Sequence, residues 1–190
     1  MAKGWFKIPG IRPEGDRSVE EQMLGLQPAL AEAKGKTVLD LGCAEGPISR
    51  AFALAGAIDV LGVELLEEHL KVARRLCADV PQVRFVCAHL DGYVAEVNPP
   101  GTVPPLFDIV LALGIIHKLD DPAVPLRFAA RSARDLLCYR ASAHARDGII
   151  VSKFKKIACN VPAVMTQEGF VEERLIPGVR GEAVQYWRRK

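Results

Sequence analysis

The feature that most constrains this chain is an apolar run that breaks into a turn of small residues. Residues 38–49 read VLDLGCAEGPIS. The aliphatic side chains at the start of the run are typical of a buried strand. Gly42, Ala44 and Gly46 then keep large side chains out of the turn, so a ligand can approach the backbone closely.

An acid follows this turn at the spacing that a cofactor site requires. A second apolar run, Ile58 to Val63, leads into Glu64, about twenty residues after the turn. At the carboxyl end of a strand, this carboxylate could accept hydrogen bonds from two neighbouring ribose hydroxyls. The turn and the acid together predict a cofactor-binding unit, although a strand-end acid alone is often only a helix cap.

Composition indicates one globular domain with no bulk preference for nucleic acid. The chain has 190 residues, of which 49% are hydrophobic and 25% charged, a proportion that supports a single core. Its 25 basic and 23 acidic residues leave a net charge of +2, which is too small to attract nucleic acid by itself. Any basic site must therefore be local.

The cysteines and the apolar segments suggest a reduced, cytoplasmic protein. The five cysteines are scattered, odd in number and nowhere spaced as CxxC, which argues against a disulfide framework and against a zinc site. We also find no signal peptide and no apolar run approaching the roughly 20 residues of a membrane span. We predict no metal ligands and no membrane contact.

Alternating strands and helices predict an α/β fold with a doubly wound, mostly parallel seven-stranded sheet and helices on both faces. The C-terminal strands, 170–176 and 183–188, are too close for a crossover helix and must form an antiparallel hairpin. The other predicted strands cover residues 37–41, 58–64, 83–88, 107–113 and 148–153, and the predicted helices cover 47–55, 67–77, 122–139 and 161–168. Leu126, Ala130, Ala133 and Leu137 would form one face of the long helix.

The N-terminal residues divide from this pattern. Residues 1–34 comprise an arm and a helix, and residues 35–190 the domain itself. Ser18 and Glu21 have the spacing of a capping box, while Gly25 and Pro28 make the helix short or broken. The arm could act as a lid.

The residues of the turn discriminate between possible cofactors. A phosphate-binding loop needs Gly-Lys-Ser or Gly-Lys-Thr, but Gly46 is followed by Pro47. A dinucleotide turn needs a third glycine where Pro47 stands, so a nicotinamide oxidoreductase is only a third choice. Asp40 and Glu45 flank the turn, and these acids favour a cofactor with an ammonium or sulfonium group. S-adenosylmethionine fits this pattern.

Several segments resemble the class I, Rossmann-like S-adenosylmethionine-dependent methyltransferases. VLDLGCAEG is similar to their first motif, and LGVEL to the strand that ends in a ribose-binding acid. FDIVLALGIIHKLDDP resembles their fourth strand and its loop, and GFVEERLIP with EAVQYWRR their closing hairpin. The resemblance spans residues 36–190 and implies methyl transfer from S-adenosylmethionine to an oxygen, nitrogen or carbon nucleophile.

The resemblance also implies a set of site residues. The turn would line the methionine part of the cofactor, Glu64 would hold the ribose, and Leu113 with Gly114 would lie beside the transferring methyl. His89 stands where the family commonly has an adenine-binding Asp, with Asp91 two residues later, and residues 141–148 replace a usual Pro-Gly-Gly. The complete predicted cofactor set is Asp40, Gly42, Cys43, Ala44, Gly46, Glu64, Leu65, His89, Leu90, Leu113 and Gly114.

His117 is the candidate catalytic residue. It follows the fourth strand, where open α/β sheets place their ligands, and its usual pKa suits a general base. It could equally be a loop histidine that packs against the next helix. Asp120 and Asp121 are better explained as helix N-terminal acids. The Asn-Pro-Pro at 98–100 precedes the fourth strand and so differs from the amino-methylating motif, which follows that strand.

The methyl acceptor and the partners are left open by the sequence. Trp5, Phe6 and Arg12 could close over the cofactor or merely pack on the body. The lysines at 153, 155 and 156 and the basic residues at 188–190 could form a rim for RNA or an acidic substrate, or a solvated surface. A lean chain mildly favours a large or exposed substrate, an oligomer or a partner chain that completes the site. A silent cofactor-binding partner subunit is the alternative to an active enzyme.

Overall fold

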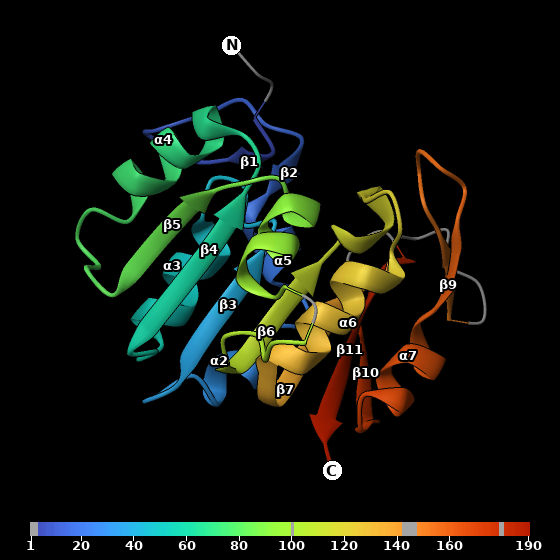
Figure 1. Ribbon diagram of the computed structural model, residues 1–190. Helices are drawn as coiled ribbons and strands as arrows, with labels where there is room; N and C mark the ends of the chain where they lie inside the picture. Colours follow the sequence, from blue (N-terminus) through green and yellow to red (C-terminus); the bar gives the residue numbers. More distant parts are fainter. Residues whose placement is uncertain (1–3, 100, 142–147, 179–180) are drawn as a thin grey trace.

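The computed structural model describes residues 4–99, 101–141, 148–178 and 181–190. Its centre is a twisted seven-stranded sheet (Figure 1), as predicted. In spatial order the strands are β5 (Val83–Cys87), β4 (Asp59–Glu64), β3 (Thr37–Leu41), β6 (Phe107–Leu113), β7 (Ala133–Arg140), β11 (Ala183–Arg189) and β10 (Phe170–Pro177).

The strand that carries the small-residue turn lies in the middle of the parallel part. β3 pairs with β4 on one side, where Leu39 lies opposite Leu61, and with β6 on the other, where Leu39 lies opposite Val110. Since the chain leaves β3 in one direction and returns on its other side at β6, the strand order reverses there. Such a reversal opens a crevice at the carboxyl ends of the strands, where α/β proteins place their ligands.

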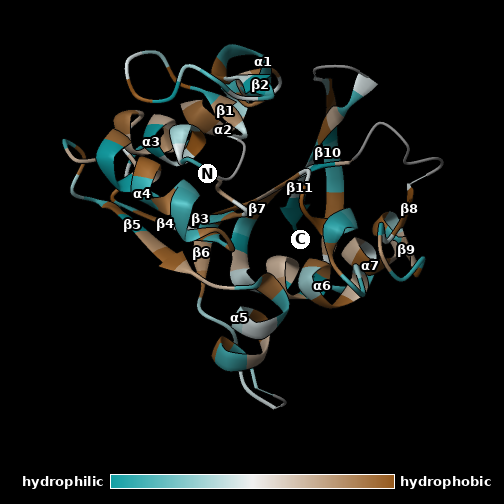
Figure 2. Cartoon of the chain, turned by 90° about the horizontal axis from the view of Figure 1, so that it is seen from above, coloured by the Kyte–Doolittle hydropathy of each residue, from teal (hydrophilic) through white to brown (hydrophobic). Residues whose placement is uncertain are grey.

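Helices cover both faces of the sheet, and Figure 2 shows the two layers from above. One face is covered by α2 (Gln27–Ala31), α3 (Pro47–Leu54) and α4 (Glu67–Leu76). The other face is covered by α5 (Leu90–Val97), α6 (Ala123–Ser132) and α7 (Val161–Gln167). Alternate residues of β6 supply the two cores: Val110 and Ala112 on the α6 face, Ile109 and Leu111 on the α3 face. Burial on both faces explains the continuous apolar sequence of this strand.

The prediction of one long helix over residues 122–139 is wrong. The helix α6 ends at Ser132, and the chain continues directly as β7. Leu126, Ala130, Ala133 and Leu137 do share one core, as the helical spacing required, but the last two reach it from a strand. β7 is buried on both faces, so its apolar residues are nearly continuous and fit a helical period as well as a strand.

The predicted fifth parallel strand at 148–153 is also wrong. Residues Ile149–Val151 form β8, which pairs antiparallel with β9 (Ala158–Asn160) in a separate two-stranded sheet. β7 takes the predicted place beside β6, so the sheet still has seven strands. The loop predicted at 141–148 falls mostly on residues outside the described ranges. Sequence analysis also missed α5, which follows β5.

The terminal hairpin forms as predicted. β10 and β11 pair antiparallel, and β11 pairs antiparallel with β7. None of the helices in the described part of the chain combines the length and apolar character that crossing a bilayer requires. All five cysteines are free thiols.

The N-terminal segment shares a core with the sheet. Its strands β1 (Phe6–Lys7) and β2 (Arg17–Ser18) pair parallel, an arrangement that the sequence did not predict. The predicted capping box is confirmed: Ser18 and Glu21 exchange hydrogen bonds at the start of α1 (Val19–Met23), and α2 follows after a break. Phe6 is buried against residues of the α3-side core.

Two buried contacts join the broken helix to the far strands. The guanidinium of Arg140, at the carboxyl end of β7, donates to Oε1 of Gln22 (3.0 Å) and to the backbone oxygens of Gln22 (2.7 Å) and Leu24 (3.0 Å). The Tyr186 hydroxyl donates to the backbone oxygen of Gly25 (2.6 Å). Because these carbonyls lie at a helix end and have few partners of their own, the donors from β7 and β11 fix how α1 and α2 lie on the sheet.

Candidate functional site

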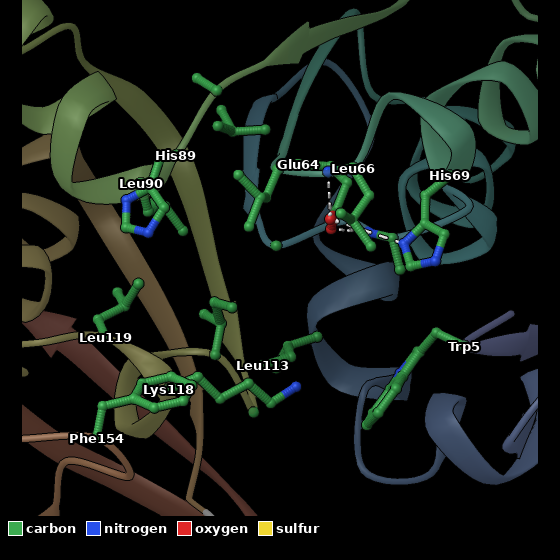
Figure 3. A pocket seen from close by; sticks show the side chains of 17 residues that line it. Trp5, Glu64, Leu66, His69, His89, Leu90, Leu113, Lys118, Leu119 and Phe154 are labelled. Atoms are coloured by element: carbon green, nitrogen blue, oxygen red, sulfur yellow. Dashed lines mark hydrogen bonds and ion pairs between the residues drawn. The ribbon is translucent and has the colours of Figure 1, made fainter. Parts of the chain in front are cut away.

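A cavity of about 440 Å³ opens at the carboxyl ends of β3, β4 and β6, where the strand order reverses (Figure 3). Its volume is in the range of small-molecule sites. Its wall combines residues of the turn after β3, the ends of β4, β5 and β6, and the N-terminal segment. The lining residues are Trp5, Gly42, Ala44, Val63, Glu64, Leu65, Leu66, His69, Ala88, His89, Leu90, Leu113, Gly114, Ile115, Lys118, Leu119 and Phe154.

The small-residue turn presents backbone to this cavity. Gly42 and Ala44 line it and have positive φ angles of 76° and 49°, which a glycine adopts freely and an alanine rarely. The N–H of Ala44 donates to Oε2 of Glu64 (3.0 Å), and that bond supports the unusual backbone. Gly46 has another role: a Cβ there would approach Phe85 to 2.9 Å and Ala73 to 3.0 Å. It therefore permits close packing of α3 against α4 and β5.

Glu64 ends β4 as predicted and lines the cavity. Its Oε1 accepts from the N–H of Leu66 (3.0 Å), in addition to the bond with Ala44. Burial alone would raise the pKa of this carboxyl, but the nearby His69 ring and the two backbone N–H groups outweigh burial and lower it. Glu64 is thus an ionised acceptor at neutral pH. Each oxygen keeps a lone pair for a ligand hydroxyl.

Asp40 lies beneath the turn and not among the described residues that line the cavity. It is 2% exposed, and its Oδ2 accepts from the Ser49 hydroxyl (2.7 Å). Burial raises the pKa of the Asp40 carboxyl from 3.8 to about 6; the Ser49 bond opposes this rise and the charge of Glu64 adds to it. Cys43 is likewise buried beneath the turn, and burial raises the pKa of its thiol.

The residues predicted to contact the adenine follow β4 and β5. Leu65, His89 and Leu90 all line the cavity. His89 is the N-cap of α5, and its Nδ1 accepts from the N–H of Asp91 (3.3 Å). The ring is half-exposed at the cavity edge, where it offers a flat surface and a ring nitrogen.

The residues predicted to lie beside the transferring methyl stand at the end of β6. Leu113 and Gly114 line the cavity, and a Cβ placed on Gly114 would meet no atom within 4 Å. Gly114 therefore leaves open space beside the strand end. His117 lies in the short helix η1 (Ile116–Lys118), and its backbone oxygen accepts from the N–H of Lys153 (2.8 Å). It is not among the described lining residues, so its role as a base stays a prediction.

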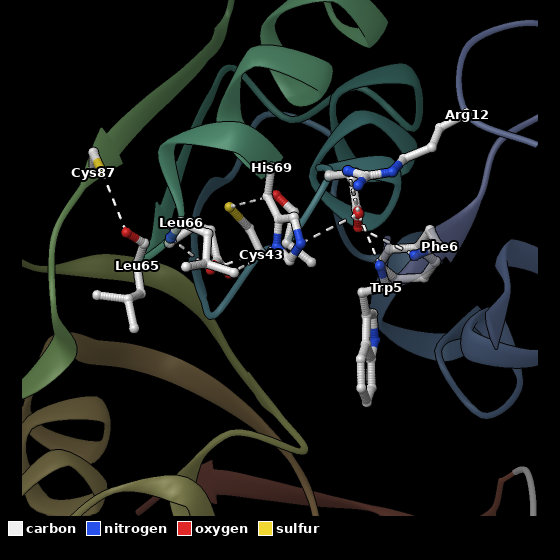
Figure 4. A network of polar contacts seen from close by, with 11 residues as sticks. Trp5, Phe6, Arg12, Cys43, Leu65, Leu66, His69 and Cys87 are labelled. Atoms are coloured by element: carbon white, nitrogen blue, oxygen red, sulfur yellow. Dashed lines mark hydrogen bonds and ion pairs between the residues drawn. The ribbon is translucent and has the colours of Figure 1, made fainter. Parts of the chain in front are cut away.

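Glu45 holds the N-terminal arm, a role that sequence analysis missed. Figure 4 labels three of the arm residues in this network, Trp5, Phe6 and Arg12. Its carboxylate is fully buried and accepts from the N–H groups of Trp5 (2.8 Å) and Phe6 (3.1 Å) and from Nη1 of Arg12 (3.3 Å). We expected this acid to face a cationic cofactor group, but its oxygens are occupied by the arm. The partners are more than thirty residues away, so no local pattern could identify them.

Among the lining residues that sequence analysis missed, two are titratable: His69 and Lys118. His69 of α4 lies between two carboxylates, with Nε2 at 3.6 Å from Glu45 and Nδ1 at 3.7 Å from Glu64. Lys118 of η1 points toward Trp5 (Figure 3), its Nζ lying 4.3 Å from the centre of the indole ring. His69 stands in an ordinary amphipathic helix and Lys118 in a short turn after β6, and only the fold brings them to the cavity.

These residues fit S-adenosylmethionine. The turn offers close backbone approach without basic side chains, Glu64 offers ionised oxygens for ribose hydroxyls, and Gly114 opens space next to a strand end. Glu64, Leu65, His89 and Leu90 would hold the nucleoside, and Gly42, Ala44 and Gly114 would lie beside the amino-acid part.

The buried Asp40 predicts a pH-dependent stability of the protein without ligand. A folded-state pKa raised from 3.8 to about 6 means that stability falls as pH rises from about 4 to about 6 and is level above that range. The rise corresponds to about 3 kcal/mol. Asp40→Asn keeps an acceptor for Ser49, and chemical denaturation should show its advantage over wild type growing from pH 4 to pH 7 by about that amount. Asp79→Asn, at an exposed site, is the control; an Asp40→Asn advantage equal at both pH values would contradict the assignment.

Comparison with known proteins identifies the family. A model of the methyltransferase domain family matches residues 38–135, which include the turn, Glu64 and β6. The ubiquinone biosynthesis O-methyltransferase of Neisseria meningitidis serogroup C is 31% identical over 102 residues, 53% of this chain and 40% of that protein. The protein of the same name from Paracidovorax citrulli is 32% identical over 134 residues, 69% of this chain and 52% of that protein. The matched region is thus about half or less of the relatives' length.

Solved structures share the fold over nearly the whole chain. Magnesium protoporphyrin IX methyltransferase from Synechocystis PCC 6803 with bound SAH superimposes with a TM-score of 0.65 at 16% identity, covering 93% of this chain and 90% of that one. The solved structure of a Listeria monocytogenes protein assigned to the S-adenosylmethionine-dependent methyltransferases superimposes with a TM-score of 0.66 at 17% identity. It covers 90% of this chain and 99% of that one. The chain therefore belongs to the methyltransferase domain family, in its class I, S-adenosylmethionine-dependent form.

Proposed function

We propose that this protein is an O-methyltransferase that moves the methyl group of S-adenosylmethionine to a hydroxyl oxygen of a small, largely apolar molecule. The observation that carries the proposal is the character of the cavity beyond the predicted cofactor residues. Trp5, Leu119 and Phe154 line that part, and they come from three separate segments of the chain. A wall of this kind fits a flat or apolar acceptor.

The N-terminal arm supports a small acceptor. The sequence of a lean domain favoured a large or exposed substrate unless the arm acted as a cap. Glu45 holds the backbone of Trp5 over one side of the cavity, so the arm supplies wall that the sheet itself lacks. We infer that the arm is the cap of the acceptor site.

The relatives support oxygen as the methylated atom. The proteins from Neisseria meningitidis and Paracidovorax citrulli are both named as O-methyltransferases. Because this chain covers only about half of the length of each relative, we do not assign it their substrate. Only oxygen as the methylated atom is part of the proposal.

The chemistry asks mainly for alignment of acceptor and methyl. S-adenosylmethionine supplies an activated methyl, so an acceptor oxygen forms the new C–O bond as the C–S bond breaks, and the hydroxyl proton leaves to a base or to water. The chain's own residues bind and orient: Glu64 fixes the ribose, Leu113 and Gly114 form the floor beside the reacting groups, and Trp5 excludes water. Positioning of this kind accounts for much of the rate in such transfers.

Removal of the Glu64 carboxylate should weaken cofactor binding. Glu64→Ala loses charge-assisted bonds to the ribose, and we expect the Kd for S-adenosylhomocysteine in calorimetry to rise about 10- to 100-fold. Glu64→Gln keeps the side-chain volume and should also weaken binding. Glu67→Ala, an exposed acid of the next helix paired with Arg74, is the matched control and should bind as wild type. Unchanged affinity in Glu64→Ala would exclude the proposed ribose contact.

Turnover separates the proposed enzyme from a silent cofactor-binding subunit. Purified protein is incubated with S-adenosylmethionine carrying a deuterated methyl group and with a panel of phenols, catechols and aryl amines. Mass spectrometry should find the label as a methyl ether, and Glu64→Ala should lower the yield at limiting cofactor. Label found only on nitrogen or carbon would overturn oxygen methylation. Cofactor binding without any transfer would favour the silent subunit.

A further inference from the structure

We propose that Lys118 binds an anionic oxygen group of the methyl acceptor, and hence that the acceptor is a planar molecule bearing a carboxylate or an ionised hydroxyl. The inference rests on the proposed methyl transfer and adds the charge of the substrate to it. It follows from a partly buried ammonium group that lines the cavity and that is not among the predicted cofactor residues described above.

Lys118 brings a positive charge into an otherwise apolar part of the cavity. Its side chain is partly buried and lines the wall with Leu119 and Ile115. The ammonium group lies against the face of Trp5, at 4.3 Å from the ring centre. Within the described residues, no carboxylate oxygen lies within 4.0 Å of its Nζ and no hydrogen bond to it is formed. A cation–π contact stabilises an ammonium but leaves its three N–H donors without acceptors.

The surroundings of Lys118 are short of negative charge. Burial is the main cause that lowers the pKa of its ammonium, and Lys153 and Arg17 lower it further, while Glu64 and Glu182 act in the opposite direction. Arg17 also lies over the Trp5 ring, at 5.5 Å from its centre, and forms an ion pair with Glu182 at 3.7 Å. An anion bound here would neutralise this excess of positive charge. The gain is large because a partly desolvated ammonium group is stabilised more by an anionic partner than a fully hydrated one is.

Two aromatic side chains accompany this charge. Trp5 comes from the arm, and Phe154 from the connection between β8 and β9. The bond from Lys153 N–H to the oxygen of His117 ties that connection to η1, directly next to Lys118. Phe154 is 66% exposed although it lines the cavity, so its ring has an open face. A planar acceptor could place its ring against these two aromatic side chains and its acidic substituent at the ammonium group of Lys118.

The cofactor itself carries a carboxylate, which is the competing partner for Lys118. The residues predicted to contact its amino-acid part belong to the turn after β3 and to Gly114. Lys118 lies further along the chain than Gly114, at the end of η1, and its Nζ lies against Trp5 of the arm, 4.3 Å from the ring centre. This grouping favours the acceptor, and the two assignments give different results with suitable ligands.

The test measures binding of a charged ring and of its neutral counterpart. Protein saturated with S-adenosylhomocysteine is titrated calorimetrically with 3-hydroxybenzoate and with 3-hydroxybenzamide. Wild type should bind the acid about tenfold more tightly than the amide or better, since a hydrogen bond to a charged group is at stake. Lys118→Met, which keeps the apolar stem, should abolish this preference. Lys118→Arg should retain most of it.

Matched controls separate this role from a structural one. Lys155 is an exposed lysine in the connection between β8 and β9 and pairs with Asp120, so Lys155→Met should keep the wild-type preference for the acid. Lys118→Met should bind S-adenosylhomocysteine and 5′-methylthioadenosine as wild type does. If it loses affinity for S-adenosylhomocysteine alone, Lys118 holds the cofactor carboxylate and the inference is overturned.

Other results would also overturn the inference. These are equal binding of acid and amide by wild type, no saturable binding of the acid, or a preference that persists in Lys118→Met. Efficient methylation of neutral phenols by wild type, with no preference for acids, would leave oxygen methylation standing and reject the role of Lys118. If no methyl transfer is found but the preference for the acid depends on Lys118, the role of Lys118 stands and the proposed methyl transfer is rejected.

Discussion

The hydrogen bonds and the ion pair of one buried carboxylate, Glu45, hold together the parts from which the cavity is built. It stands in the turn after β3, and it accepts from the backbone of Trp5 and Phe6 and from the side chain of Arg12. A buried carboxylate without such partners would cost several kcal/mol, so the arm and the turn depend on each other. His69, near both Glu45 and Glu64, extends the same contact to the end of β4.

This attachment gives the cavity two sides of opposite charge. The sheet side carries the ionised Glu64 above the buried Asp40, and this side suits a cofactor with hydroxyl groups and a cationic centre. The opposite side carries Lys118 beside Trp5, and Arg17 lies over the same indole ring outside the cavity lining. Since the two sides come from segments far apart in the chain, their charges are set independently. A donor and an acceptor of different charge can therefore lie side by side.

The sequence predicted those parts that local patterns determine. The strand Thr37–Leu41, the turn after it and Glu64 were located correctly, because a buried parallel strand, a small-residue turn and a strand-end acid each have a local signature. β7 was mistaken for helix because a strand buried on both faces has the same apolar residues as a buried helix. Glu45 was assigned to the cofactor instead of the arm, and His69 and Lys118 escaped notice, because the roles of all three depend on partners brought near only by the fold.

The most direct test of this account is to measure the arm and the cofactor together in Glu45→Gln. Hydrogen exchange and calorimetry with S-adenosylhomocysteine are performed on the same protein. The account predicts faster exchange at the amides of Trp5 and Phe6, unchanged protection in β3 and β4, and at least tenfold weaker cofactor binding. Wild-type affinity in a variant whose arm amides are released would contradict it, because the cavity would then not need the arm.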